Sequence, residues 1–418
     1  MIEDPDPRDV LRAWRGVVAA LTLVASVAPA HAAGRHAPPP SPLEEEGVEP
    51  PGAPEEAPSE FGQQNAAYRA FKETLHREYG LDYRLDLTLL PQWTAAKGGE
   101  PVGNFIYSPV VSWRPFTDTA AGSGAFVVAY FGNDFWTKHD IVSLQSHVGF
   151  LSPPSDWFSD LSNLAQLTYT HTAPGAWNWL SITVGQYSFA IYDDNRYAGN
   201  SQLRFENDAA QNATQTYTSG DLGTFAQITA PDRQWLIAGG FQGADNIDGV
   251  GVSSRGLADG RLAYFAAARV TPRGFGGSYG LLWYAQPAVP EQPSRSQGVS
   301  FSGEQSLAAG WVAHLRANTA SGAANPIRTS VAAGVVREDV FGRERPDQLG
   351  LGLSWNKTNL KAVTQPARNG ELVAEAFVNY ALLDRLKVGP DLQLYDHPAL
   401  APGSAAAAVI SLRATASF

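Results

Sequence analysis

Residues 81–89, LDYRLDLTL, decide the fold class, because apolar and polar side chains alternate strictly along them. The odd positions from Leu81 to Leu89 are apolar, and the even positions are Asp, Arg, Asp and Thr. Side chains of a β-strand point alternately to the two faces of its sheet, so this stretch predicts a strand with one apolar and one polar face. The same alternation recurs along the chain, for example at 349–355 and 372–380. We therefore predict an all-β protein.

About 18 segments show this alternation, and many approach the roughly 9–11 residues that a tilted membrane-spanning strand needs. Turn-forming residues separate them, such as AAGSG at 120–124. The predicted strands lie near 81–92, 104–114, 124–131, 142–150, 163–171, 178–189, 222–230, 234–241, 261–270, 277–285, 298–303, 306–317, 328–337, 347–356, 359–364, 371–380, 387–394 and 405–418.

Aromatic residues gather near the ends of several predicted strands. Such rings prefer the headgroup level of a bilayer, where membrane barrels carry aromatic girdles. The core of a soluble β-sandwich is the alternative, but a sandwich does not need so many long strands in one chain. The residues that we place in these girdles are Trp93, Tyr107, Trp113, Tyr130, Trp177, Trp179, Tyr284 and Trp355.

The N-terminal 80 residues differ in composition from the rest. Residues 1–33 read as a signal peptide, with an apolar run at 16–27 that is shorter than the ~20 residues of a membrane-spanning helix and AHA at 30–32 as a cleavage site. Residues 34–63 are rich in Pro and Glu and predict a disordered periplasmic linker. Residues 64–80 predict a short helix that ends at Gly80 and plugs or caps one end of a barrel.

Residues 81–418 are left as the main domain, and after residue 33 no segment approaches ~18 uninterrupted apolar residues. A closed β-barrel is the other way to satisfy every backbone group in lipid. We therefore predict a transmembrane antiparallel β-barrel in the outer membrane of a Gram-negative bacterium, surrounded by outer-membrane lipid.

The composition excludes several function classes. The chain has no Cys, so no thiolate metal site and no thiol nucleophile exist. A net charge of −11 argues against a nucleic-acid partner, which requires a basic surface. The sequence has no HExxH, P-loop or GxSxG motif, and its eight His residues show no metal-ligand spacing. We predict no catalytic residue, no metal and no cofactor, and we interpret Asp193 as a turn residue.

The C-terminal strand ends in an aromatic residue. Residues from Ile410 to Phe418 alternate between apolar and polar, and Phe418 is last. This pattern resembles the signal by which the bacterial barrel-assembly machinery recognises its clients. We therefore predict Phe418 as an assembly signal.

On strands with a clear apolar outer face, the opposite residues are expected to line the lumen. Charges of both signs, amides and hydroxyls suit a water-filled passage for uncharged polar solutes. The long polar stretch at 195–220 is predicted to fold into the lumen, with surface exposure as the alternative. The candidate lining residues are Arg84, Asp86, Arg261, Arg269, His314, Arg316 and Asn318 on strands, and Arg196, Arg204 and Glu206 on this stretch.

Several segments from about residue 79 to the C-terminus resemble the carbohydrate-selective porins of Gram-negative bacteria, the OprB family. They are TVGQY at 183–187, YDDNRYAGNSQLRF at 192–205, QWLIAGGFQ at 234–242, GWVAHLRAN at 310–318 and DQLGLGLSW at 347–355. The resemblance implies a barrel of sixteen strands, monomeric or homotrimeric, through which small sugars or other polar solutes diffuse. A barrel enzyme such as a lipid hydrolase and a non-conducting structural or secretion-accessory barrel remain the alternatives.

Overall fold

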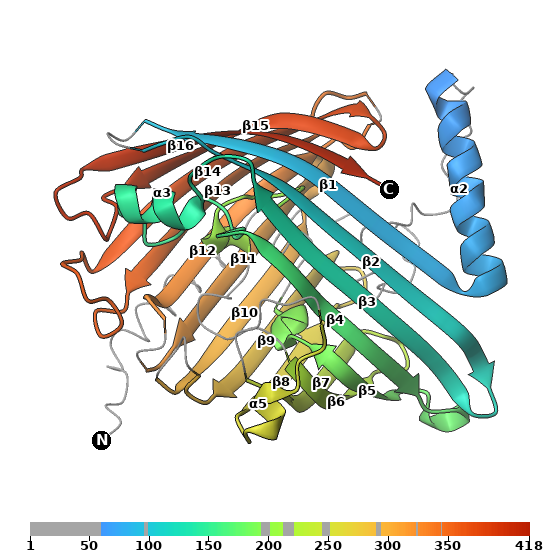
Figure 1. Cartoon of the computed structure of the whole chain (residues 1–418). Coiled ribbons are helices and arrows are strands. Elements are labelled where there is room, and N and C mark those ends of the chain that lie inside the picture. The colour runs from blue at the N-terminus through green and yellow to red at the C-terminus, as the bar shows by residue number, and fades with distance from the viewer. Residues whose placement is uncertain are drawn as a thin grey trace.

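A computed structural model describes residues 60–95, 99–193, 201–211, 221–244, 251–289, 294–322, 325–343 and 345–418. Within these ranges, sixteen antiparallel strands pair in chain order, and β1 pairs with β16 to close the barrel (Figure 1). The predicted fold class is confirmed, and sixteen is the number that the family resemblance implied.

The strands are β1 (Leu81–Thr94), β2 (Val102–Thr119), β3 (Gly122–Phe135), β4 (Leu161–Thr172), β5 (Leu180–Tyr187), β6 (Asp221–Thr229), β7 (Trp235–Gly243), β8 (Leu262–Val270), β9 (Gly277–Gln286), β10 (Ser296–Ser306), β11 (Trp311–Ala320), β12 (Ile327–Glu338), β13 (Gln348–Thr358), β14 (Gly370–Leu383), β15 (Leu386–Asp396) and β16 (Ala406–Ser417). The helices are α2 (Glu60–Tyr79), α3 (Ile141–Val148), α4 (Asp208–Gln211) and α5 (Arg255–Ala258), with short 3₁₀ turns η1 (Gly175–Trp177), η2 (Phe189–Tyr192) and η4 (Ala308–Gly310).

The predicted strand at 142–150 is wrong, because this segment forms α3 instead. Ile141, Leu144 and Val148 are buried at helical spacing. The side chain of Asp140 accepts a hydrogen bond from the Ser143 N–H at 2.8 Å, and Gly149 ends the helix with a φ of 82°. This apolar run is too short for its periodicity to distinguish a helix from a strand. The capping residues at its two ends therefore determine that it forms a helix.

The predicted strand at 359–364 is also wrong. These residues form a turn between β13 and β14. The Asn359 side-chain amide donates to the carbonyl oxygens of Gly322 and Asn325, both at 2.9 Å, and the Ala362 N–H donates to the Asn359 carbonyl at 2.9 Å. An Asn that bonds to nearby backbone in this way favours a turn over a strand.

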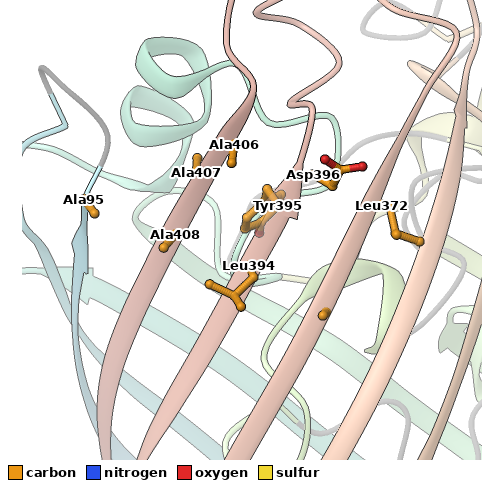
Figure 2. Close-up of a pocket in the computed structure, with 9 residues that line it drawn as sticks. Ala95, Leu372, Leu394, Tyr395, Asp396, Ala406, Ala407 and Ala408 are labelled. Atoms are coloured by element: carbon orange, nitrogen blue, oxygen red, sulfur yellow. The ribbon is translucent and has the colours of Figure 1, made fainter.

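The barrel wall is apolar outside and polar inside. On β16, Ile410 and Leu412 are about half exposed on the outer face, whereas Ser411, Arg413 and Thr415 are buried on the inner face. A water-soluble protein shows the opposite pattern, and an outer face of this kind suits contact with lipid. On the same outer face, the small side chains of Ala406 and Ala408 leave a shallow hollow beside β15 (Figure 2).

Most of the girdle predictions fit the outer face, with one exception. Trp93, Trp113, Trp177 and Trp355 are all exposed. Tyr284 is fully buried and stacks on Phe189 inside the barrel, with ring centroids 5.6 Å apart, so its placement in a girdle is wrong. The physical reason is register: Trp283 points outward on β9, so the next residue must point inward.

The N-terminal helix α2 lies at the rim of the barrel beside the start of β1 (Figure 1). It begins at Glu60, four residues before the predicted start and inside the predicted linker, and Gly80 follows it with a φ of 63°. Tyr68 contacts the ring of Tyr83 edge-on, and Arg385 lies 3.4 Å from the Tyr68 ring centroid. The helix therefore packs on the rim and does not plug the lumen.

Two further findings concern the ends of the chain. Residues 1–59, which hold the predicted signal peptide and most of the predicted linker, lie outside the described residues. In the part of the chain that is described, no helix is long and apolar enough to cross a membrane. At the other end, Phe418 exchanges two backbone hydrogen bonds with Leu85, at 2.9 and 3.0 Å, and so completes the seam between β16 and β1.

Candidate functional site in the barrel lumen

Two connections between strands turn into the lumen and occupy it. One joins β5 to β6, and residues 201–211 of this connection are all buried. The other, residues 136–160, joins β3 to β4 and carries α3. We call residues 201–211 the inner segment. It is buried against strands that lie far apart in the sequence, so its contacts show how the interior of the barrel is filled.

Arg413 on β16 is the main charged contact of the inner segment. Its guanidinium donates hydrogen bonds to the carbonyl oxygens of Ser201 and Arg204, at 2.5 and 2.6 Å, and to the Asn379 side-chain oxygen at 3.0 Å. It also lies 3.4 Å from a carboxylate oxygen of Glu206. One arginine therefore joins the backbone of the segment to its acidic side chain.

Side chains on two further strands bind the inner segment at Glu206 and Asn207. The Glu375 carboxylate accepts hydrogen bonds from the backbone N–H groups of Glu206 and Asn207. The Asn207 side-chain amide donates to the Gln393 side-chain oxygen at 3.0 Å and to the Tyr395 hydroxyl at 2.8 Å. Glu375 lies on β14, and Gln393 and Tyr395 lie on β15. Together with Arg413 on β16, they fix the segment to three adjacent strands.

Phe205 is the apolar anchor of the inner segment. Its ring packs edge-on against Phe377 at 5.0 Å between centroids and lies 4.8 Å from the ring of His314. A Cβ on Gly352 would come 2.7 Å from Phe205 Cε1, and one on Gly334 would come 3.0 Å from Phe205 Cζ. Glycine at these two strand positions makes room for the ring.

The connection at 136–160 is tied to the wall by Glu371. The carboxylate of this residue accepts hydrogen bonds from the N–H groups of Leu151 at 2.8 Å and Ser152 at 2.9 Å. The Ser152 hydroxyl donates to the Asn207 side-chain oxygen at 2.8 Å. The two inward connections therefore support one another as well as the wall.

A buried ion pair lies before the inner segment. Asp193 and Arg316 form it, and both side chains are about 1% exposed. Arg316 also donates to the carbonyl oxygen of Gln211. The interpretation of Asp193 as a turn residue is incomplete: it does follow a 3₁₀ turn, but its carboxylate bonds to β11 across the lumen.

The structure brings together half of the predicted lining residues. Arg204, Glu206, His314, Arg316 and Asn318 are all buried inside the barrel. His314 contacts the inner segment at Phe205, and Arg316 contacts it at Gln211. Arg204 donates to the Gln348 side-chain oxygen at 3.1 Å.

The other predicted lining residues lie elsewhere. Arg84 pairs with Asp86 at 2.7 Å where β1 begins, and Arg261 pairs with Asp259 at 3.0 Å near the opposite end. Arg269 is partly buried on the inner face of β8. Arg196 lies outside the described residues.

Sequence reasoning missed several residues that hold the inner segment. Arg413 and Glu375 both occupy polar positions of alternating strands, and this is the signal that could have found them. Glu371 occupies such a position too. Among the described residues, no group of three or more His, Asp or Glu side chains could hold a metal ion.

Glu206 lies on the inner segment, outside the spanning strands, and its carboxyl group has an unusually high pKa. Burial and the nearby carboxylate of Asp391 raise its pKa to about 8, and Arg413 and hydrogen bonds from Ser411 and Gln92 oppose that rise. The proton is therefore held more tightly when the segment is packed against the wall than when Glu206 is in water, where its pKa is near 4.5.

This linkage predicts a dependence on pH. The stabilisation that the proton gives to the packed segment is complete below about pH 4.5 and is lost as the pH rises through about 8. We expect the segment to leave the wall more often at pH 9 than at pH 5, seen as larger fluctuations in current through single barrels in a lipid bilayer. Glu206→Gln should show a smaller difference between the two pH values, and an unchanged pH dependence in this variant would contradict the assignment.

Comparison with known proteins agrees with this architecture. Residues 181–418 match the family model described as "Carbohydrate-selective porin, OprB family". The chain belongs to the OprB family. It is 33% identical over 351 residues to Porin AaxA of Chlamydia pneumoniae, which covers 80% of this chain and 78% of that protein. Porin AaxA of Chlamydia abortus is 31% identical over 353 residues, with 82% and 78% covered. These relatives are named as porins, which are transport proteins and not enzymes.

Solved structures support the same barrel at the level of fold. The high-pH structure of Pseudomonas putida OprB matches with a TM-score of 0.69 at 14% identity, covering 84% of this chain and 97% of that one. An anion-selective porin from Comamonas acidovorans matches with a TM-score of 0.51 at 8% identity, covering 81% and 99%. In this OprB-family porin, the inner segment lies inside the barrel with all of residues 201–211 buried.

Proposed function

We propose that this OprB-family porin lets carbohydrates or similar small, uncharged polar solutes diffuse passively across the outer membrane, past the inner segment. The observation that carries the proposal is the mixed polarity of the contacts around that segment. Arginine, carboxylate and amide groups meet there, in Arg413, Glu206, Glu375 and Asn207. Such a set combines hydrogen-bond donors and acceptors, which are the groups that sugar hydroxyls bind. The passage requires no cofactor.

Sugar permeation is tested most simply with liposomes that contain the refolded porin. In osmotic swelling assays, we expect rapid entry of glucose and progressively slower entry of di- and trisaccharides, because the inner segment narrows the lumen. Protein that migrates as a folded barrel in heat-modifiability gels but gives no swelling with any sugar would contradict the proposal.

The loops suggest an orientation. The connections at one end are short, such as those between β2 and β3 and between β14 and β15, whereas the connections at the other end include 136–160 and 188–220. Outer-membrane barrels have short periplasmic turns and longer outer loops. We therefore infer that α2 and both chain ends of the barrel face the periplasm, in a Gram-negative outer membrane. Light scattering in detergent distinguishes a monomer from a homotrimer.

We further propose that the barrel-assembly machinery recognises the C-terminal strand through Phe418. Deleting this residue removes both its ring and its two backbone hydrogen bonds to Leu85. We expect a severalfold lower amount of folded, heat-modifiable barrel in outer-membrane fractions. Phe418→Ala keeps the backbone bonds, so an equal loss in this variant would attribute the effect to the ring, while Phe418→Tyr should assemble normally. Normal assembly of the deletion variant would refute the role.

A further inference from the structure

A row of uncharged polar side chains crosses the inner face of three strands, and several of its atoms have no hydrogen-bond partner among the described residues. Asn318 on β11 is in register with Ser330 on β12, and Ser330 is in register with Asn356 on β13. The three side chains are 4%, 4% and 0% exposed. The Asn318 side-chain oxygen, the Ser330 hydroxyl and both amide atoms of Asn356 lack a hydrogen-bond partner. Both ring nitrogens of His314, on the same face of β11, also lack one.

The adjoining wall behaves differently. Where the inner segment crosses β13 to β16, the wall side chains of Gln348, Glu375, Asn379, Gln393 and Arg413 all bond to it. On the neighbouring strand β11, Arg316 also bonds to the segment, through the carbonyl oxygen of Gln211, whereas the described atoms of the polar row make no such bond.

The one-turn helix α4, at the end of the inner segment, lies over β12 and β13. It is held from other directions: the Asp208 N–H donates to the Pro153 carbonyl and the Ala209 N–H to the Ser152 hydroxyl, both at 3.2 Å. Beneath α4, Ala210 and Ala332 border a small cavity that has room for about one water molecule. Ala332 and Ser354, which line this cavity, lie two residues from Ser330 and Asn356 on the same inner face, so α4 lies beside the polar row. No hydrogen bond joins the described atoms of α4 to the row atoms that lack a partner.

Buried amide and hydroxyl groups without partners are costly, and apolar side chains of similar size would pack under α4 at no such cost. Polar groups in this row are explained if they bond to something when α4 is displaced. Two amides and a hydroxyl supply donors and acceptors without charge, which matches the hydroxyl groups of a sugar. A site that pairs these groups also distinguishes a hydroxylated solute from an apolar one.

We propose that Asn318, Ser330 and Asn356 form a binding site for polyhydroxyl solutes, which opens when α4 moves away from β12 and β13. The site rests on the proposed function, because the solute must first enter the lumen. It adds to that function a defined binding site on the barrel wall, separate from the charged contacts of Arg413 and Glu375.

The first test holds α4 against the wall with an engineered disulfide bond. The chain has no native Cys, so the two introduced cysteines can pair only with each other. Ala210→Cys with Ala332→Cys joins α4 to β12 by a disulfide. In planar bilayers we expect the oxidised form to lose most of the current block caused by glucose, and reduction to restore it. Ala317→Cys with Val331→Cys joins β11 to β12 through cross-strand partners on the outer face and should leave the block unchanged. Equal block by glucose in the oxidised and reduced lock would overturn the proposal.

The second test removes the polar groups one at a time. Asn356→Leu should weaken the apparent affinity for glucose by about tenfold, the loss expected for roughly one hydrogen bond, and Ser330→Ala should weaken it less. The matched control is Thr183→Val on β5, whose hydroxyl is bonded to that of Thr170 at 2.8 Å. Unchanged affinity in Asn356→Leu overturns the site while leaving the proposed function intact. Folded wild-type protein that forms no conducting steps at all would instead overturn the proposed function, and the site with it.

Discussion

Arg413→Leu is expected to raise the time-averaged single-channel conductance severalfold. Arg413 donates hydrogen bonds to two carbonyl oxygens of the inner segment, at Ser201 and Arg204. Hydrogen bonds from a charged group are worth roughly 1.5–3 kcal/mol each. Losing about 3 kcal/mol shifts the balance between packed and displaced segment by roughly 100-fold or more. Because the segment occupies the lumen, its displacement widens the passage.

The measurement is single-channel recording in a planar bilayer at fixed salt and pH. Arg385→Leu is the matched control, since Arg385 stacks on Tyr68 at the rim and lies outside the lumen. It should conduct as the unmodified protein does. A folded Arg413→Leu barrel with unchanged conductance would show that the inner segment does not restrict the passage.

Leu353→Arg is expected to destabilise the barrel strongly, because Leu353 points outward at the middle of β13 and is 52% exposed. An arginine at the bilayer midplane on the lipid face of a barrel costs about 2–4 kcal/mol, and about 0–1 kcal/mol near the membrane surface. Leu349 lies on the same face of β13 at its start, so Leu349→Arg should cost much less.

The free energy of unfolding in lipid vesicles, measured by denaturant titration, gives both values. Leu353→Ala separates the cost of the charge from the loss of the leucine side chain. Similar small losses for the two arginine variants would contradict the placement of this face in lipid.

The alternation of polar and apolar residues predicts most of this fold, because each strand carries the pattern within its own few residues. Sixteen of the predicted segments correspond to the sixteen strands, and in β13 and β16 the outer face follows from the pattern alone. The strand prediction at 142–150 is wrong because the capping residues Asp140 and Gly149 favour a helix more strongly than the short apolar run favours a strand. The strand prediction at 359–364 is wrong because the Asn359 side-chain amide donates to the Gly322 carbonyl in a neighbouring connection and so favours a turn.

The candidate site was only partly predictable. Face assignment correctly places His314, Arg316 and Asn318 on the inner wall. It cannot pair Arg413 with Ser201 or Asp193 with Arg316, because these contacts join residues more than 100 positions apart across the lumen. Such pairings depend on how the two inward connections pack against the closed barrel, and no local pattern encodes them.

Conduction and its block by sugar test the central claim most directly. The refolded protein is inserted into a planar lipid bilayer, single-channel current is recorded, and glucose is then titrated in. The account predicts stable open steps that glucose reduces in a saturable way, as expected for solutes that bind within the lumen. Steps that no sugar affects would indicate a general porin without a carbohydrate site. The absence of any steps from protein that is demonstrably folded would contradict the account.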